Sequence, residues 1–211
     1  MDSENAYNAR RLNVTNVEKY IGTLGDGITN VQLVRQKCLN IVPLLQKDYG
    51  KLNDCALTAI TMAVNYYTHG IYDPYILYIG VEGKAKQNSY NGDTYGTPNV
   101  KVRRIFEQSL RLFGQKRIKP CARFYKGICF TERTIVNAIN NSKPVLLCTQ
   151  DDGRNYYKKH CILIVGYADY EYLDKNNKKH TKRMLIAYDN WFKSHAYVDY
   201  KKLSLSTDII Y

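Results

Sequence analysis

The fold of this chain is decided by residues 53–64, which read NDCALTAITMAV. Small and apolar side chains occupy nearly every position after Asp54, so the stretch predicts a helix that is buried on all sides. Asn53 or Asp54 is expected to cap its start, and Gly70 is expected to end it. Cys55 lies in the first turn, where free backbone N–H groups and the helix dipole favour the thiolate form of a cysteine. We therefore take Cys55 as a candidate nucleophile.

A single cysteine is weak evidence for catalysis, because free cysteine is among the most buried residue types and usually packs as a small hydrophobe. The chain has six cysteines. None of them forms a C-x-x-C pair and their spacing matches no zinc pattern, so reduced thiols are expected. Cys55 therefore needs partners elsewhere in the chain before it counts as a catalytic residue.

Composition predicts one globular domain, because 45% of the 211 residues are hydrophobic and 24% are charged. No apolar run approaches the ~20 residues that cross a bilayer, so no membrane span is expected. The polar, acidic start of the chain differs from a signal peptide, which makes a cytoplasmic location the default expectation. A net charge of +12 predicts attraction to anionic surfaces. Its basic residues form short scattered pairs without a nucleic-acid motif, so specific nucleic-acid binding is not expected.

The order of patterns along the chain predicts helices first and an antiparallel sheet second, which is an α+β architecture. Residues 1–36 are expected to form an N-terminal extension or a surface helix, with a weak helical pattern over 14–24, and residues 37–211 the main domain. Further helices are expected over 100–113 and 131–141. Strands are expected over 122–125, 143–149, 160–167, 184–191, 196–200 and 207–211, a short apolar segment over 71–81, and polar loops over 82–98 and 150–159.

A nucleophilic cysteine needs a base within hydrogen-bond reach and a third group that fixes the tautomer of that base. His160 begins an apolar strand, and Asp189 lies near the end of the next one. If these strands form a hairpin around the polar residues 174–178, His160 comes beside Asp189 within a residue or two. The two residues together are therefore better candidates than either would be alone.

These segments resemble the papain-like cysteine peptidases, and most closely the bacterial branch related to double-glycine leader peptidases. The resemblance rests on NDCALTA opening a helix, on HCILIVGY (residues 160–167) as a strand, and on Asp189-Asn190-Trp191 after it. It covers residues 41–200. In this superfamily the third catalytic member lies two residues before a tryptophan, which selects Asp189 over Asn190. The resemblance implies a papain-like fold over residues 37–211, amide hydrolysis through a thioester, a peptide or protein substrate, and no metal or cofactor.

The resemblance also implies a glutamine upstream of the cysteine whose side chain completes an oxyanion hole. Gln46 is the candidate, at the end of the approach IVPLLQ (residues 41–46). The spacing departs from the papain pattern, which usually places the glutamine six positions before the cysteine, where this chain has Gly50. Some bacterial relatives use a longer loop, and Asn53 is the other amide nearby.

Two other functions stay open from the sequence. The same triad order serves transglutaminase-like and other acyl transferases, and a cell-wall peptide amidase would also suit a basic surface. The second alternative is a non-enzymatic binding module on a peptidase scaffold, in which tyrosines and lysines make the contacts and Cys55 is only packed. The chain has 20 tyrosines, which is an unusual number.

Overall fold

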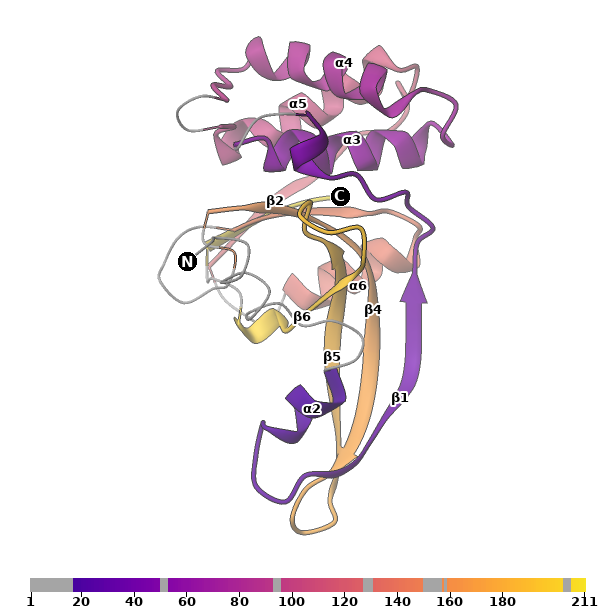
Figure 1. The fold of residues 1–211 in the computed structure, drawn as a ribbon, viewed down its shortest axis with the longest axis vertical. Helices are drawn as coiled ribbons and strands as arrows, with labels where there is room; N and C mark the ends of the chain where they lie inside the picture. The colour runs from indigo at the N-terminus through magenta and orange to yellow at the C-terminus, as the bar shows by residue number, and fades with distance from the viewer. Residues whose placement is uncertain are drawn as a thin grey trace.

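The computed structural model describes residues 17–49, 53–92, 96–126, 131–149, 157, 159–202 and 206–211. Its architecture is α+β, as the sequence predicted, with a helical layer packed on an antiparallel sheet (Figure 1). Residues 14–16 of the expected N-terminal helix, Gly50 and most of the expected loop over 150–159 lie outside the described residues.

The central helix is α3 (Cys55–Tyr67), and its residues from Ala56 to Asn65 are all buried. It packs against the sheet on one side and against the other helices of the layer on the other. Asp54 occupies the N-cap position, but its side chain makes no capping hydrogen bond. Its carboxylate instead accepts the hydroxyl groups of Tyr78 and Tyr90. Helix α3 begins at Cys55, as the sequence predicted.

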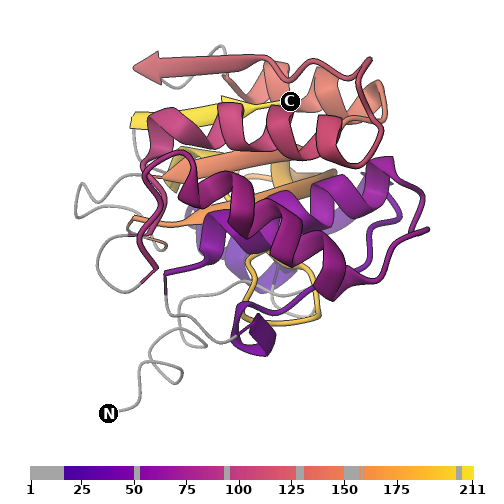
Figure 2. The ribbon, with the colours of Figure 1, turned by 90° about the horizontal axis from the view of Figure 1, so that it is seen from above.

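Helices α4 (Pro74–Lys86) and α5 (Asn99–Leu112) complete this layer and face the viewer in Figure 2. The sequence predicted α5 but predicted a loop from residue 82, whereas α4 continues to Lys86. The start of α4 is strongly specified, because the carboxylate of Asp73 accepts the N–H of Tyr75 at 2.8 Å and proline occupies the first turn. Buried Val81 and Ala85 extend its packed face.

Within the described residues the sheet has seven strands, and every pairing is antiparallel. The strand order is β2-β7-β3-β4-β5-β6, and β1 pairs with the distal part of β4. Helix α6 (Thr131–Asn140) packs against β3 and β4, away from the helical layer. The strands are β1 (Thr29–Cys38), β2 (Ala122–Lys126), β3 (Val145–Thr149), β4 (Cys161–Leu173), β5 (Lys179–Tyr188), β6 (Ala196–Val198) and β7 (Ser206–Ile210).

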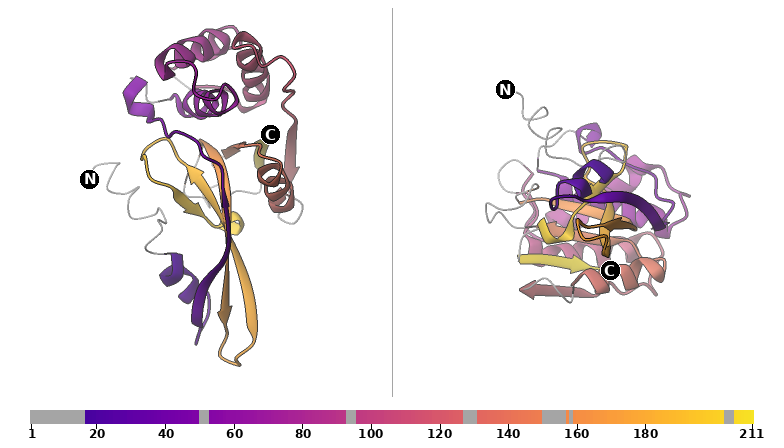
Figure 3. Two further views of the ribbon diagram at one scale, coloured as in Figure 1. Left: turned by 90° about the vertical axis from the view of Figure 1, so that its right-hand side faces the viewer. Right: turned by 90° about the horizontal axis from the view of Figure 1, so that it is seen from below.

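Strands β1, β4 and β5 form a long arm that extends away from the helical layer (Figures 1 and 3). The short helix α2 (Val17–Gly22) lies beside this arm. Strand β1 was not predicted, because eight of its ten residues are exposed and its sequence shows little apolar alternation. It lies across the boundary expected between residues 36 and 37. Two short 3-10 helices, η2 (Gln46–Tyr49) and η3 (Tyr200–Lys202), complete the described elements.

Candidate active site

Cys55 lies where the first turn of α3 meets the start of β4. Backbone N–H groups of Cys161 and Ala56 donate hydrogen bonds to its sulfur. These bonds favour the thiolate, but burial has the larger effect and raises the pKa of the Cys55 thiol to about 11. The thiolate that the helix position alone predicted is therefore not the resting form. The resting site holds a neutral thiol.

His160 directly precedes β4 and is buried. Its Nε2 atom lies 2.9 Å from the main-chain carbonyl oxygen of Asp189. A carbonyl oxygen can only accept, so Nε2 carries the proton and Nδ1 is left with a free lone pair. Burial lowers the pKa of His160 to about 4, although the bond to Asp189 opposes this change. The ring is therefore neutral at pH 7 and can act as a base through Nδ1.

The orientation of the His160 ring is also set by aromatic contacts. The ring of Trp191 stacks on it at 4.1 Å between centroids, with 18° between the planes. Tyr157 lies 5.7 Å from both rings. These contacts follow from the hairpin, in which Leu163 pairs with Tyr188, so that continuing the register places His160 opposite Trp191. The sequence had placed His160 opposite Asp189, and the difference of two residues is within the range it allowed.

Asp189 is fully buried at the end of β5 and contacts His160 through its main chain. The carboxylate oxygen Oδ1 accepts the backbone N–H of Trp191 at 3.3 Å. The structure thus places His160 beside Asp189, and Nε2 of His160 bonds to the main-chain carbonyl oxygen of Asp189.

Asn190 is a site residue that the sequence analysis passed over in favour of Asp189. It is fully buried, and its Nδ2 donates to the main-chain carbonyl of Cys55 at 2.9 Å and to that of Cys161 at 2.8 Å. One amide thus joins the start of α3 to the start of β4. Its backbone has a φ of 69°, a conformation that asparagine tolerates better than most residues. An asparagine two positions after the end of β5 was the available signal.

Gln46 is the first residue of η2 and is buried beside the same cluster. Its backbone N–H donates to the carbonyl oxygen of Asn190 at 2.8 Å. The competing amide, Asn53, donates its Nδ2 to the carbonyl oxygen of Gly92 at 2.9 Å and is held by that contact. Of the two amides the sequence offered, Gln46 is therefore the one whose backbone is bonded to the residues around Cys55.

Two further cysteines, Cys148 and Cys161, lie near Cys55. The Sγ atoms of Cys148 and Cys161 are 2.7 Å apart, on directly paired positions of β3 and β4, and both thiols are free. Among the described residues, no group of three or more histidine, cysteine or acidic side chains could hold a metal ion. The described helices also include none that is long and apolar enough to cross a membrane.

The α+β fold, with a cysteine at the start of a core helix beside a histidine on the sheet, defines a papain-like protein. A comparison with protein-family models matches residues 28–206 to the Peptidase_C39 like family, and the chain belongs to this family. The comparison with curated proteins found no match. Family membership confirms the resemblance seen in the sequence, and it supports a cysteine peptidase whose substrates are peptides or proteins.

Proposed function

We propose that this protein hydrolyses peptide bonds through a thioester acyl-enzyme, with Cys55 as nucleophile, His160 as base and then acid, Asp189 as the group that orients His160, and Gln46 as oxyanion donor. The observation that carries the proposal is the convergence at Asn190. Its side chain bonds the carbonyls of Cys55 and of Cys161, the residue after His160, and its own carbonyl accepts the N–H of Gln46. Asn190 thus bonds residues from 46–55 and from the start of β4, which are distant from each other and from Asn190 in sequence.

The proposed reaction starts from two neutral groups. Nδ1 of His160 accepts the thiol proton while Sγ of Cys55 attacks the substrate carbonyl carbon, and the oxyanion is stabilised by Gln46 and the N–H of Cys55. The imidazolium then gives its proton to the leaving amine, and a thioester remains on Cys55. Water attacks this thioester, His160 takes a proton from the water, and the thiol recovers that proton as the carboxylic acid product leaves.

The neutral resting forms of Cys55 and His160 constrain when the proton is transferred in this mechanism. With a thiol pKa of about 11 and an imidazole pKa of about 4, an ion pair is unfavourable before substrate binds. Proton transfer must therefore accompany attack on the carbonyl, where the developing oxyanion replaces the thiolate as the site of negative charge. This favours general-base catalysis over a preformed thiolate–imidazolium pair.

The alternative with a specific observation in its favour is a non-catalytic binding module on the same scaffold. A half-buried thiol with a raised pKa is a poor nucleophile at rest, and this is what a merely packed cysteine would show. The two functions differ in a measurable way, because only a catalytic Cys55 forms a covalent intermediate with a peptide.

The test is cleavage of a complex peptide mixture, followed by mass spectrometry of the new termini. Wild type and Cys121→Ala, which removes an exposed cysteine, should give the same products, whereas Cys55→Ala and His160→Ala should each lose at least about 100-fold in rate. Adding glycinamide separates transfer from hydrolysis, since an acyl transferase would give amide products. Full cleavage by Cys55→Ala would refute the peptidase proposal, and no cleavage by wild type would favour the binding module.

A further inference from the structure

The outer side of α4 carries a group of large apolar side chains that are exposed to solvent. We call this group the outer face. Its members and their exposed fractions are Ile71 (73%), Tyr75 (58%), Ile76 (54%), Ile79 (47%) and, from the end of α5, Leu112 (51%). Exposed apolar side chains are ordinary when single, but a contiguous group of them indicates an interaction site.

The outer face is contiguous because of helix geometry. Tyr75, Ile76 and Ile79 are spaced so that they share one side of α4, opposite the buried side that includes Leu77 and Val81. Leu112 joins them from α5, since a Cβ atom added at Gly80 would lie 3.1 Å from its Cδ2 atom. The apolar surface therefore runs across both helices.

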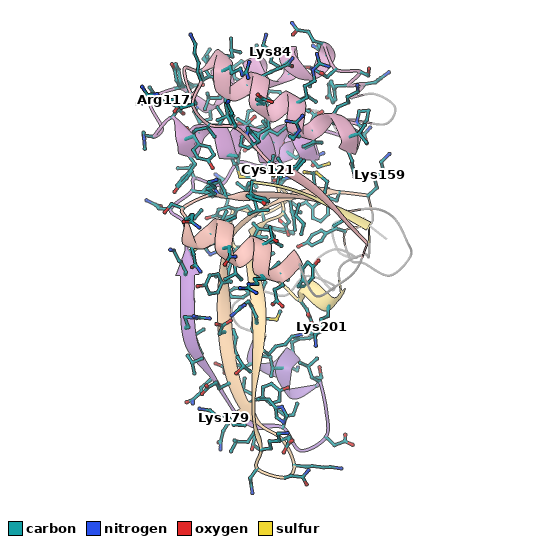
Figure 4. The ribbon with its side chains drawn as sticks, turned by 180° about the vertical axis from the view of Figure 1, so that it is seen from behind. Lys84, Arg117, Cys121, Lys159, Lys179 and Lys201 are labelled. Atoms are coloured by element: carbon teal, nitrogen blue, oxygen red, sulfur yellow. The ribbon has the colours of Figure 1, made fainter. Side chains whose placement is uncertain are left out.

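Basic residues outnumber acidic ones in the helical layer that carries the outer face. Residues 53–120 contain nine lysines and arginines against five acidic residues. Four of these acids are already engaged within the layer. Asp54 accepts two tyrosine hydroxyls and Asp73 caps α4, while Glu82 pairs with Lys86 and Glu107 pairs with both Arg103 and Arg111. Lys84 and Arg117 extend at the end of the molecule where α4 lies, far from the tip of the arm marked by Lys179 (Figure 4).

We propose that the outer face docks the protein on the surface of an anionic lipid membrane. Apolar side chains with lysine and arginine around them are the composition of helices that lie in the lipid interface, and a tyrosine such as Tyr75 suits the boundary between headgroups and acyl chains. Anionic headgroups complement the excess of positive charge. The same charge opposes a second copy of this chain as the occupant, because two outer faces in contact would bring two basic layers together.

Docking in this orientation leaves the candidate active site accessible. Helix α4 is the member of the layer farthest from the sheet, and α3 lies between it and β4 (Figure 1). Cys55 begins α3 and lies against the start of β4, where the backbone N–H of Cys161 bonds its sulfur. The proposal is independent of the peptidase function, since it depends only on surface residues.

The test is cosedimentation of the full chain with lipid vesicles. Wild type should bind vesicles of phosphatidylcholine with about 30% phosphatidylglycerol, bind pure phosphatidylcholine far more weakly, and lose binding as salt rises. Ile76→Ser with Ile79→Ser should weaken partitioning more than tenfold. Lys84→Gln with Arg117→Gln should weaken it by roughly fivefold for each cation removed.

The matched control is Lys175→Gln with Lys178→Gln, which removes the same charge from the hairpin at the tip of the arm. This variant should bind like wild type. If the control lost as much vesicle binding as the Lys84 and Arg117 variant, binding would depend on net charge alone. That result would overturn the docking site. Absence of wild-type binding to anionic vesicles would also overturn it, as would self-association that the two serine substitutions abolish.

Discussion

The imidazole of His160 shows how burial decides the charge of a site residue. Its ring contacts those of Trp191 and Tyr157, and its Nε2 bonds to the carbonyl oxygen of Asp189. A neutral ring fits this buried environment, because an imidazolium would lose its hydration there. The lowered pKa of His160, about 4, is the result. This residue should therefore couple protein stability to pH.

His160 should make the protein less stable as the pH falls from neutral toward 5. The unfolded chain takes up a proton near the ordinary histidine pKa of 6.5, while the folded state resists protonation until about pH 4, so the unfolded state binds more protons in between. The expected loss from His160 between pH 7.5 and pH 5 is about 2 kcal/mol. Urea unfolding followed by the fluorescence of Trp191 measures it.

Two variants isolate this contribution. His160→Gln removes the titrating group, so its free energy of unfolding should change about 2 kcal/mol less over the same pH range. His69→Asn replaces an exposed histidine whose φ is 55°, which asparagine tolerates, and it should keep the wild-type pH dependence. An equal pH dependence in wild type and His160→Gln would show that His160 is not buried as described.

At the scale of residues, the sequence predicted which residues lie together better than it predicted their protonation. Cys55, His160, Asp189 and Gln46 were proposed from short motifs, and the structure brings their segments together around Asn190. The protonation of the site could not be predicted, because it depends on how completely distant segments exclude water. The thiolate at Cys55 was expected from its helix position, and burial by the sheet reverses that expectation.

At the scale of elements, the arm depends on a close approach between β1 and β4. A Cβ atom added at Gly166 would meet the carbonyl oxygen of Lys37 and come 2.9 Å from the Cα atom of Cys38. Gly166→Ala is therefore expected to push the strands apart and to cost about 1–3 kcal/mol of stability, as overpacking typically does. Thermal and urea unfolding of the purified variant measure this cost.

The matched control for Gly166 is Gly83 in α4. A Cβ atom there would have no neighbour within 4 Å, and alanine is a better helix former than glycine. Gly83→Ala is expected to stabilise the protein by about 0.5–1 kcal/mol. If Gly166→Ala were as stable as wild type, β1 would not lie against β4 at this point.

The two elements that the sequence missed, β1 and the full length of α4, were missed for different reasons. Helix α5 was predicted because its apolar residues recur at helical spacing, and strand β3 because it is a continuous run of β-branched and apolar residues. Strand β1 is held to β4 mainly by main-chain pairing and is largely exposed, so it has no such pattern. Asp73 and the proline after it were a helix start signal in front of α4 that the sequence analysis did not use.

At the scale of the whole molecule, the candidate active site lies between the helical layer and the sheet. The position of one relative to the other must therefore stay fixed for the proposed reaction. Cys55 belongs to the helical layer, and His160 belongs to the sheet. The side chain of Asn190 bonds both, through the carbonyls of Cys55 and Cys161. A shift of about 1 Å between reacting groups can cost about 100-fold in rate, so this link should affect activity more than stability.

Asn190→Gly tests the link without straining the backbone, since glycine accepts the φ of 69° at this position. Its matched control is Asn88→Gly, because Asn88 is also buried and its Nδ2 also makes two bonds of 2.8 Å, to the carbonyl of Lys84 and to Oε1 of Gln108. These bonds stay within the helical layer. Both variants should lose about 1–3 kcal/mol of stability, from two hydrogen bonds each.

Only Asn190→Gly should also lose activity, by at least tenfold in kcat/KM for a cleaved peptide, measured well below the unfolding transition of both variants. The alkylation rate of Cys55 by iodoacetamide gives a second readout that needs no substrate, and it should change in Asn190→Gly alone. If the two variants lost activity in proportion to their stability, Asn190 would be a packing residue. A selective loss would mean that one amide sets the spacing between nucleophile and base across the two layers.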